Sequence, residues 1–249
     1  MKRLLIAILA LLPTFAMASS ANAPVLEHAN VDIRDKAAMQ RGAKLYMNYC
    51  MGCHALQYQR YERTFNDLGI PLDLGIQHLV PEGVKVGELM TNAMNAEDGG
   101  KWFGVAPPDL TLITRLKGSG TKGQDWVFTY LKSFYADPTR PFGVNNEVFK
   151  DVGMPHALIE LQGLPVHATE KRLVDGDMKD VYVGLKATGG SMNASEYDGA
   201  VRDLVTFLTY VAEPSRVDSE AIGKNVIIFL LVLLVLVFLL KKEFWRDIH

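Results

Sequence analysis

Sixteen consecutive residues near the carboxyl end, residues 225–240, carry no charge and consist almost wholly of Leu, Val, Ile and Phe. Extended back to Ile222, the run would form a helix about 28 Å long, which matches a hydrocarbon core of about 30 Å. A helix in the core of a soluble domain would need protein packed on every side of this run. We therefore predict a membrane span over residues 222–240, with membrane lipid as its surroundings.

The amino terminus predicts a secretory signal peptide. Two basic residues precede an apolar run over residues 4–15, and two Ala-x-Ala sites follow, ending at Ala18 and Ala23. This order is typical of a signal peptide, and the run is too short to span a membrane. We expect residues 1–23 to be this segment, with cleavage after Ala18 or Ala23; an uncleaved anchor is the alternative.

Export of the amino terminus fixes the expected orientation of the chain. The basic residues Lys241 and Lys242 follow the span directly, which favours a cytoplasmic location for residues 241–249. Residues 24–221 then form a domain on the other side of the membrane. For a bacterial chain this means a periplasmic domain held at the inner membrane by a single span.

The exported part of the chain is acidic. Over residues 24–223 the formal charge is −6. This charge argues against nucleic acid as a partner and mildly favours a basic protein, because opposite surface potentials steer two molecules together.

The only two cysteines stand three positions apart and a histidine follows the second, since residues 50–54 read Cys-Met-Gly-Cys-His. Cys50 and Cys53 can each add to one vinyl group of the same porphyrin while His54 reaches the iron, and C-x-x-C-H is the signature of this attachment. A disulfide is the alternative in an oxidising compartment, but it leaves His54 unexplained. A zinc site would need a second ligand cluster. The motif predicts one covalently bound haem c.

The sixth iron ligand decides what such a haem can do. A thioether raises the potential and suits electron transfer, whereas an open position suits gas binding or peroxide chemistry. Met154 stands between a glycine and a proline in a rigid, non-helical loop that could present its sulfur. His156 and Met192 remain alternatives on the local sequence. Met90 and Met94, spaced as on one face of a helix, are expected to pack in the core.

Three longer helices are expected in the domain that carries this motif. Residues 35–49 predict a helix that leads into the motif and carries the small Gly42, which would let another helix approach. Apolar and aromatic residues over 124–135 predict a second helix. The clearest prediction is a helix over 195–213 that is capped by Ser195 and stopped by proline.

Two shorter elements complete the expected secondary structure. Asp109 can cap a short helix that carries Leu110, Ile113 and Leu116. Residues 175–177, Asp-Gly-Asp, predict a hairpin turn, and a short strand is expected shortly after it.

Four stretches of the chain are distinctive in their order: the motif at 50–54, Ala-Pro-Pro-Asp-Leu at 106–110 followed by Arg115, Gly-Met-Pro at 153–155, and residues 203–214 directly before the span. Together with the single carboxyl-terminal span, they resemble the cytochrome c1 family, the haem subunit of the quinol:cytochrome c oxidoreductase, or cytochrome bc complex. The resemblance covers nearly the whole mature chain.

The resemblance implies a mostly α fold, a class I cytochrome c domain with large insertions over residues 60–101 and 160–192. In single-haem cytochromes c the last helix crosses the first, here near Gly42 and Tyr46. The resemblance also implies the roles of several site residues: Met154 as the second axial ligand beside His54, Arg115 as the neutraliser of a haem propionate, and the segment containing Pro108 as lining of the haem pocket.

The resemblance further implies an electron carrier that accepts electrons from the Rieske iron–sulfur protein and passes them to a soluble or tethered cytochrome c, beside cytochrome b. Such a subunit makes and breaks no substrate bond, so it is an enzyme only as part of its complex. Two alternatives are a tethered haem subunit of a terminal oxidase or nitric oxide reductase, and a five-coordinate haem sensor or peroxidase-like domain.

Overall fold

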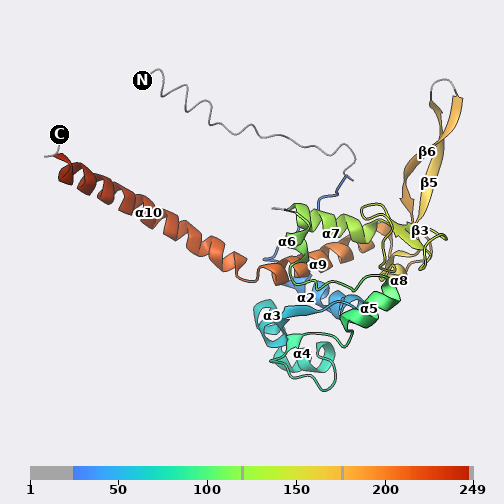
Figure 1. Cartoon of the computed structure of the whole chain (residues 1–249), viewed down its shortest axis with the longest axis horizontal. Helices are drawn as coiled ribbons and strands as arrows, with labels where there is room; N and C mark the ends of the chain where they lie inside the picture. The colour runs from blue at the N-terminus through green and yellow to red at the C-terminus, as the bar shows by residue number, and fades with distance from the viewer. Residues whose placement is uncertain (1–24, 119–120, 175–176, 247–249) are drawn as a thin grey trace.

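The computed structural model describes residues 25–118, 121–174 and 177–246. The predicted signal peptide, residues 1–23, lies outside the described residues, as do the last three residues of the predicted tail. The described chain is mostly helical, with short helices and three two-stranded sheets in a head from which one long helix extends (Figure 1). The predicted fold class is thereby confirmed.

The helix that leads into the haem motif has two parts. α2 (Lys36–Leu45) begins where the side chain of Asp35 accepts a hydrogen bond from the N–H of Ala38. It continues directly into a π-helical turn, η1 (Tyr46–Cys50). The predicted helix over 35–49 is confirmed, and the π turn at its end is of a kind often found at functional sites.

α9 (Ala194–Ala212) crosses α2 at the centre of the head. The backbones touch at Gly42, where an added Cβ would lie 2.1 Å from the carbonyl oxygen of Asp203. One turn further along, the rings of Tyr46 and Phe207 are 5.8 Å apart. The predicted crossing of the first and last helices of the head is confirmed, and it depends on the absence of a side chain at Gly42.

The amino-terminal cap of α9 differs from the prediction. Asn193, not Ser195, is the cap: its side chain accepts hydrogen bonds from the N–H groups of Ser195 and Glu196. The side chain of Glu196 in turn accepts a hydrogen bond from the N–H of Asn193. Ser195 already lies in the first turn. Asparagine competes with serine as a cap, and here it begins the helix two residues earlier than expected.

Replacing Asn193 with Ala is expected to lower the free energy of unfolding by about 1 kcal/mol, because two N–H groups of the first turn lose their acceptor. Urea unfolding of the detergent-solubilised full chain, followed by circular dichroism, measures the change. Ser195→Ala is the matched control, and we expect it to have little effect. Equal losses in the two variants would contradict this assignment of the cap.

α6 (Ile113–Leu116) and α7 (Lys122–Lys132) pack beside α9. The helix predicted over 124–135 ends earlier than expected, at Lys132, and Phe134–Ala136 form strand β3, which pairs with β4 (Val144–Asn146). The side-chain amide of Asn146 donates to the carbonyl oxygen of Tyr130, 2.8 Å away, in the last turn of α7. A residue outside the helix therefore satisfies its end and lets the chain turn into a strand.

The first insertion folds over one side of the head. It contains, with the residues just before it, five elements: β1 (Leu56–Arg60), α3 (Tyr61–Leu68), α4 (Leu72–Leu79), β2 (Leu89–Met90) and α5 (Ala96–Phe103). The prediction that Met90 and Met94 share a helix was wrong, because Met90 lies in β2 opposite Leu56 and Met94 lies in the loop before α5. Met90 is fully buried, so its predicted core packing is confirmed.

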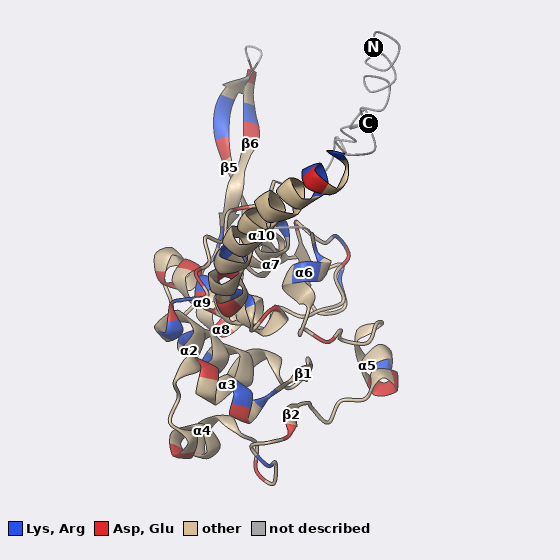
Figure 2. Cartoon of the chain, turned by 90° about the vertical axis from the view of Figure 1, so that its left-hand side faces the viewer, with Lys and Arg blue, Asp and Glu red and all other residues tan. Residues whose placement is uncertain are grey.

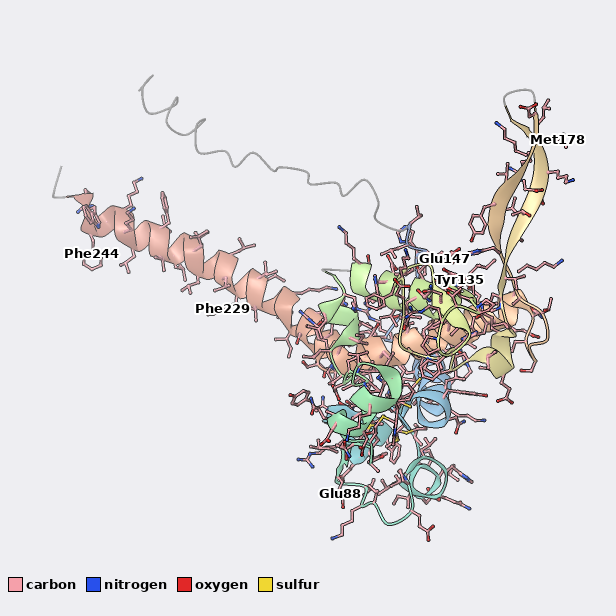
Figure 3. All side chains as sticks on the ribbon, turned by 45° about the vertical axis from the view of Figure 1, so that its right-hand side comes forward. Glu88, Tyr135, Glu147, Met178, Phe229 and Phe244 are labelled. Atoms are coloured by element: carbon pink, nitrogen blue, oxygen red, sulfur yellow. The ribbon has the colours of Figure 1, made fainter. Side chains whose placement is uncertain are left out.

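The second insertion is a β-hairpin that projects from the head (Figure 1). It follows α8 (Ile159–Gln162) and consists of β5 (Val166–Val174) and β6 (Asp177–Lys186), paired antiparallel and longer than the short strand expected from the sequence. At its base the ring of His167 lies 4.2 Å from that of Tyr135. Figure 3 shows Tyr135 at this base, beside Glu147, and Met178 near the opposite end.

α10 (Arg216–Phe244) is one continuous helix that leaves the head, and none of its residues is buried. It is long and apolar enough to cross a membrane, with a mean hydropathy of 2.8 over its most apolar window. Figure 2 shows its charges confined to the two ends, and Phe229 lies midway along it (Figure 3). The predicted span, residues 222–240, lies wholly inside this helix.

The junction between head and α10 is short and held by ion pairs. Residues 213–215 alone separate α9 from α10. Glu220, near the start of α10, pairs with Arg34 at 2.5 Å and with Arg216 at 3.0 Å. Because Arg34 belongs to the amino-terminal segment of the head, this pairing joins the two parts directly.

Candidate functional site

Cys50 and Cys53 lie on one tight turn at the end of η1. The N–H groups of Cys53 and His54 both donate to the carbonyl oxygen of Cys50, at 3.1 and 2.9 Å. Both cysteines are free thiols, so the structure holds no disulfide between them. Burial, with a smaller contribution from Cys53, raises the pKa of the Cys50 thiol to about 12. The turn thus presents two neighbouring thiols together with the imidazole of His54.

The imidazole of His54 is oriented by a backbone carbonyl. Its Nδ1 lies 2.7 Å from the carbonyl oxygen of Pro108. A carbonyl can only accept, so Nδ1 carries the proton and Nε2 keeps its lone pair. Burial also lowers the pKa of His54, which favours the neutral ring. A neutral imidazole held in this way is the arrangement that prepares a histidine to bind a metal through its other nitrogen.

The segment over residues 106–110 lies beside the haem motif and is fastened to it. The N–H of Leu110 donates to the carbonyl oxygen of Ala55 at 2.9 Å, and the N–H of Gln57 donates to a carboxylate oxygen of Asp109 at 2.8 Å. Asp109 also accepts from the N–H of Thr111. The prediction that Asp109 caps the following helix was wrong, since α6 begins after Leu112. Its carboxylate instead connects the segment over residues 106–110 with the strand that contains Gln57 through hydrogen bonds.

A cavity of about 280 Å³ opens beside these residues. Cys53 lines it from the haem motif, and Pro107 and Asp109 line it from the neighbouring segment. Gly99, on α5, packs against Pro107 so closely that an added Cβ would lie 2.7 Å from its Cδ. The sequence prediction that the Pro-Pro-Asp segment and the haem motif share one site is consistent with this arrangement.

Met154 lies in a loop that the backbone of α5 holds in place. A Cβ added at the preceding Gly153 would lie 2.7 Å from the carbonyl oxygen of Phe103. Met154 is half-buried, next to a small apolar cluster that contains Phe134 and Val152. Its Sδ lies 3.4 Å from the hydroxyl of Tyr130, which donates to it. The sulfur is therefore fixed on the side of α7.

Tyr130 is the residue at this site that sequence reasoning missed. The aromatic pattern over 124–135 predicted only core packing, and the spacing of Trp126 and Tyr130 along one helix face was the sole signal. Nothing in the local sequence connects that face with a methionine 24 positions later.

His156, the rival ligand, is buried among aromatic residues. Its ring stacks on that of Phe134, with centroids 5.0 Å apart and planes within 3°. Burial lowers the pKa of His156 to about 4, so its ring is neutral. Met192, the other rival, packs against the main core. Met192 therefore serves as a packing residue. His156 also packs, but its Nε2 is buried without a hydrogen-bond partner among the described residues, so this nitrogen stays available as a ligand.

Arg115 forms an ion pair across the head. Its guanidinium pairs with the carboxylate of Glu213 at 2.5 Å, between α6 and the end of α9. Both side chains are largely exposed, at 57% and 41%.

In the part of the chain that the structure describes, no group of three or more His, Cys, Asp or Glu side chains could hold a metal ion. A zinc site thus has no ligand set among those residues.

Comparison with known proteins identifies the family of this chain. The family model described as the Cytochrome C1 family matches residues 90–248. The chain belongs to the cytochrome c1 family. It is 47% identical to the cytochrome c1 of Allochromatium vinosum over the full length of both chains.

Two further relatives are informative because of their names. The chain is 40% identical to the ammonia monooxygenase gamma subunit of Nitrosomonas europaea, over 100% of this chain and 98% of that protein. It is 26% identical to cytochrome b/c1 of Bradyrhizobium diazoefficiens, over 86% of this chain and 34% of that protein.

Membership of the cytochrome c1 family makes this chain a membrane-anchored haem protein of electron transport, and it implies haem c as the cofactor. The donor groups of the haem motif fit that cofactor. Two unpaired thiols and a neutral imidazole lie on one turn, with the Pro108 carbonyl holding Nδ1 and leaving Nε2 to bind a metal.

Proposed function

We propose that the chain is the electron carrier of a quinol:cytochrome c oxidoreductase. It would hold one haem c through thioethers to Cys50 and Cys53, with His54 and Met154 as the axial ligands. The observation that carries the proposal is the 2.7 Å hydrogen bond from His54 Nδ1 to the carbonyl of Pro108. This bond fixes the tautomer that an iron-binding imidazole needs.

The surrounding residues suit this task. Haem c supplies one-electron iron chemistry, and a thioether ligand raises its potential relative to a second histidine. Pro108 orients the His54 ring, and Met154 packs against the apolar cluster that contains Phe134. Rigid ligands limit the rearrangement that accompanies each change of charge, which favours electron transfer over substrate chemistry.

Arg115 is proposed to neutralise a haem propionate. Its present partner, Glu213, is exposed, and exposed ion pairs contribute only about 0–1 kcal/mol. A propionate with better geometry could therefore replace Glu213, or share the guanidinium with it, at little cost.

The ligand role of Met154 is tested by Met154→Leu. Ferric wild-type protein is expected to show the weak far-red absorption band that reports sulfur bound to iron, and the variant is expected to lose it and to bind carbon monoxide when reduced. Met178→Leu, at the exposed far end of the hairpin, is the control and should keep the band. A far-red band that persists in Met154→Leu would disprove the assignment of Met154 as the axial ligand, and His156 would then have to be tested in its place.

The proposed partners are cytochrome b, the Rieske iron–sulfur protein as electron donor, and a soluble or tethered cytochrome c as acceptor. The relative named cytochrome b/c1 supports the first of these, because its name joins the two cytochromes. The charge of −6 over residues 24–223 suits a basic acceptor. We place the head in the periplasm and the carboxyl-terminal end of α10 in the cytoplasm, since Lys241 and Lys242 follow the span.

The experiment is purification of the tagged full chain from its own membranes in mild detergent. We expect cytochrome b and an iron–sulfur protein to co-purify, and added quinol to reduce the haem of this chain. Recovery of the haem chain without a cytochrome b, or haem that quinol cannot reduce in the isolated complex, would disprove the assignment.

One observation favours a second candidate. The relative named ammonia monooxygenase gamma subunit aligns over nearly its whole length at 40% identity. The chain could thus serve as the haem subunit of another membrane oxidoreductase. The same purification distinguishes the two candidate functions, because in a monooxygenase assembly subunits other than cytochrome b and the iron–sulfur protein would co-purify with this chain.

A further inference from the structure

The hydroxyl of Tyr130 reaches the sulfur that the proposed function assigns to iron. The two atoms are 3.4 Å apart, with the O–H as donor and the thioether as acceptor. We infer that Tyr130 is a positioning residue that fixes the Met154 sulfur and limits how strongly it donates electrons to the iron. This inference rests on the proposed function, because it requires Met154 to be the ligand.

The phenol of Tyr130 is held so that it cannot swing away from the sulfur. Its ring stacks on that of Trp126, with centroids 4.9 Å apart and planes within 10°. The ring of Phe134 meets it edge-on at 5.2 Å. Asn146 anchors the backbone of Tyr130 from the neighbouring strand. The hydroxyl is therefore fixed from two faces and from the main chain.

The hydroxyl has no competing partner in the described part of the chain. The Met154 sulfur is the one acceptor that Tyr130 meets there. A phenol has an ordinary pKa of about 10, so at neutral pH its O–H is available as a donor. A thioether is a weak acceptor, but a partly buried donor without another protein acceptor favours even a weak one.

The hydrogen bond has a definite effect on the ligand. It draws on a lone pair of the sulfur, which becomes a poorer donor to iron. Oxidised iron depends more on that donation than reduced iron does, so the contact disfavours the oxidised state and raises the potential. Hydrogen bonds to coordinating atoms are a recognised way in which a protein tunes a haem.

The test is Tyr130→Phe in the full-length haem protein, which keeps the ring stack and removes only the hydroxyl. We expect the far-red band to remain and the reduced-to-oxidised ratio at a fixed solution potential to fall about threefold. That change corresponds to roughly 28 mV, since a tenfold change is 59 mV for one electron. The concentration of imidazole needed to displace the sulfur in the oxidised protein should rise about threefold.

Tyr197→Phe is the matched control. Tyr197 is a buried tyrosine of the same head, and its hydroxyl donates to the carbonyl of Leu131 at 2.8 Å instead of to a sulfur. An unchanged or raised potential in Tyr130→Phe, a lost band, or an equal fall in Tyr197→Phe would overturn the inference. A wild-type protein without the far-red band would instead disprove Met154 ligation itself, and the inference with it.

Discussion

Replacing both Cys50 and Cys53 with serine is expected to leave a chain that carries no haem after denaturation. The two thiols are the only cysteines in the sequence, so no other thioether can form. Electrophoresis under denaturing conditions, followed by a stain for haem peroxidase activity, measures the loss. Each single variant should keep one thioether and a weaker stain.

Gly52→Ala is the control for this experiment. It alters the same turn without touching a thiol, and nothing lies within 4 Å of the Cβ that it adds. We expect its stain to match that of the wild type. Haem retained by the double variant under denaturing conditions would contradict covalent attachment at these cysteines.

Gly42→Ala is expected to lower the free energy of unfolding by about 3 kcal/mol, at the upper end of what overpacking a core costs. The added methyl would lie 2.1 Å from the carbonyl oxygen of Asp203 and 2.8 Å from Cβ of Phe207. Backbone cannot rotate out of the way as a side chain can, so α2 and α9 must move apart. Urea unfolding of the haem-loaded chain measures the loss.

Gly199→Ala supplies the matched control, since Gly199 lies on α9 with nothing within 4 Å of an added Cβ. Alanine favours a helix over glycine by about 1 kcal/mol, so this variant should be at least as stable as the wild type. A Gly42→Ala variant as stable as Gly199→Ala would show that the two helices do not depend on this close approach.

The features that sequence reasoning predicted correctly are those that residues close together in the sequence determine. The helix that contains the predicted span over residues 222–240 and the paired strands on either side of residues 175–176 each follow from a local pattern of apolar or turn-forming residues. The family follows from four short motifs and their order. None of these depends on knowing what a distant segment does.

The failures have the opposite cause. α7 ends at Lys132 because Asn146, sixteen positions beyond Tyr130, satisfies its last turn. Met90 and Met94 have helical spacing, but pairing of β2 with β1 overrides it. Each outcome was set by a contact that no local window contains.

The same limit applies within the site. The sequence named the thiols, His54 and Met154, but it could not show which atoms orient them. Pro108 orients His54 through its backbone carbonyl, which no side-chain pattern can predict. In the sequence, Tyr130 cannot be told from a helix tyrosine that only packs in the core.

The short junction between α9 and α10 bears on how such a protein can exchange electrons. Only residues 213–215 connect the two helices, and Glu220 near the start of α10 forms an ion pair with Arg34 in the head. A carrier on a long flexible tether can travel between its donor and its acceptor. With only residues 213–215 between α9 and α10, the head cannot move far from the end of its anchor, so in the proposed electron transfer its donor and its acceptor would have to come to it.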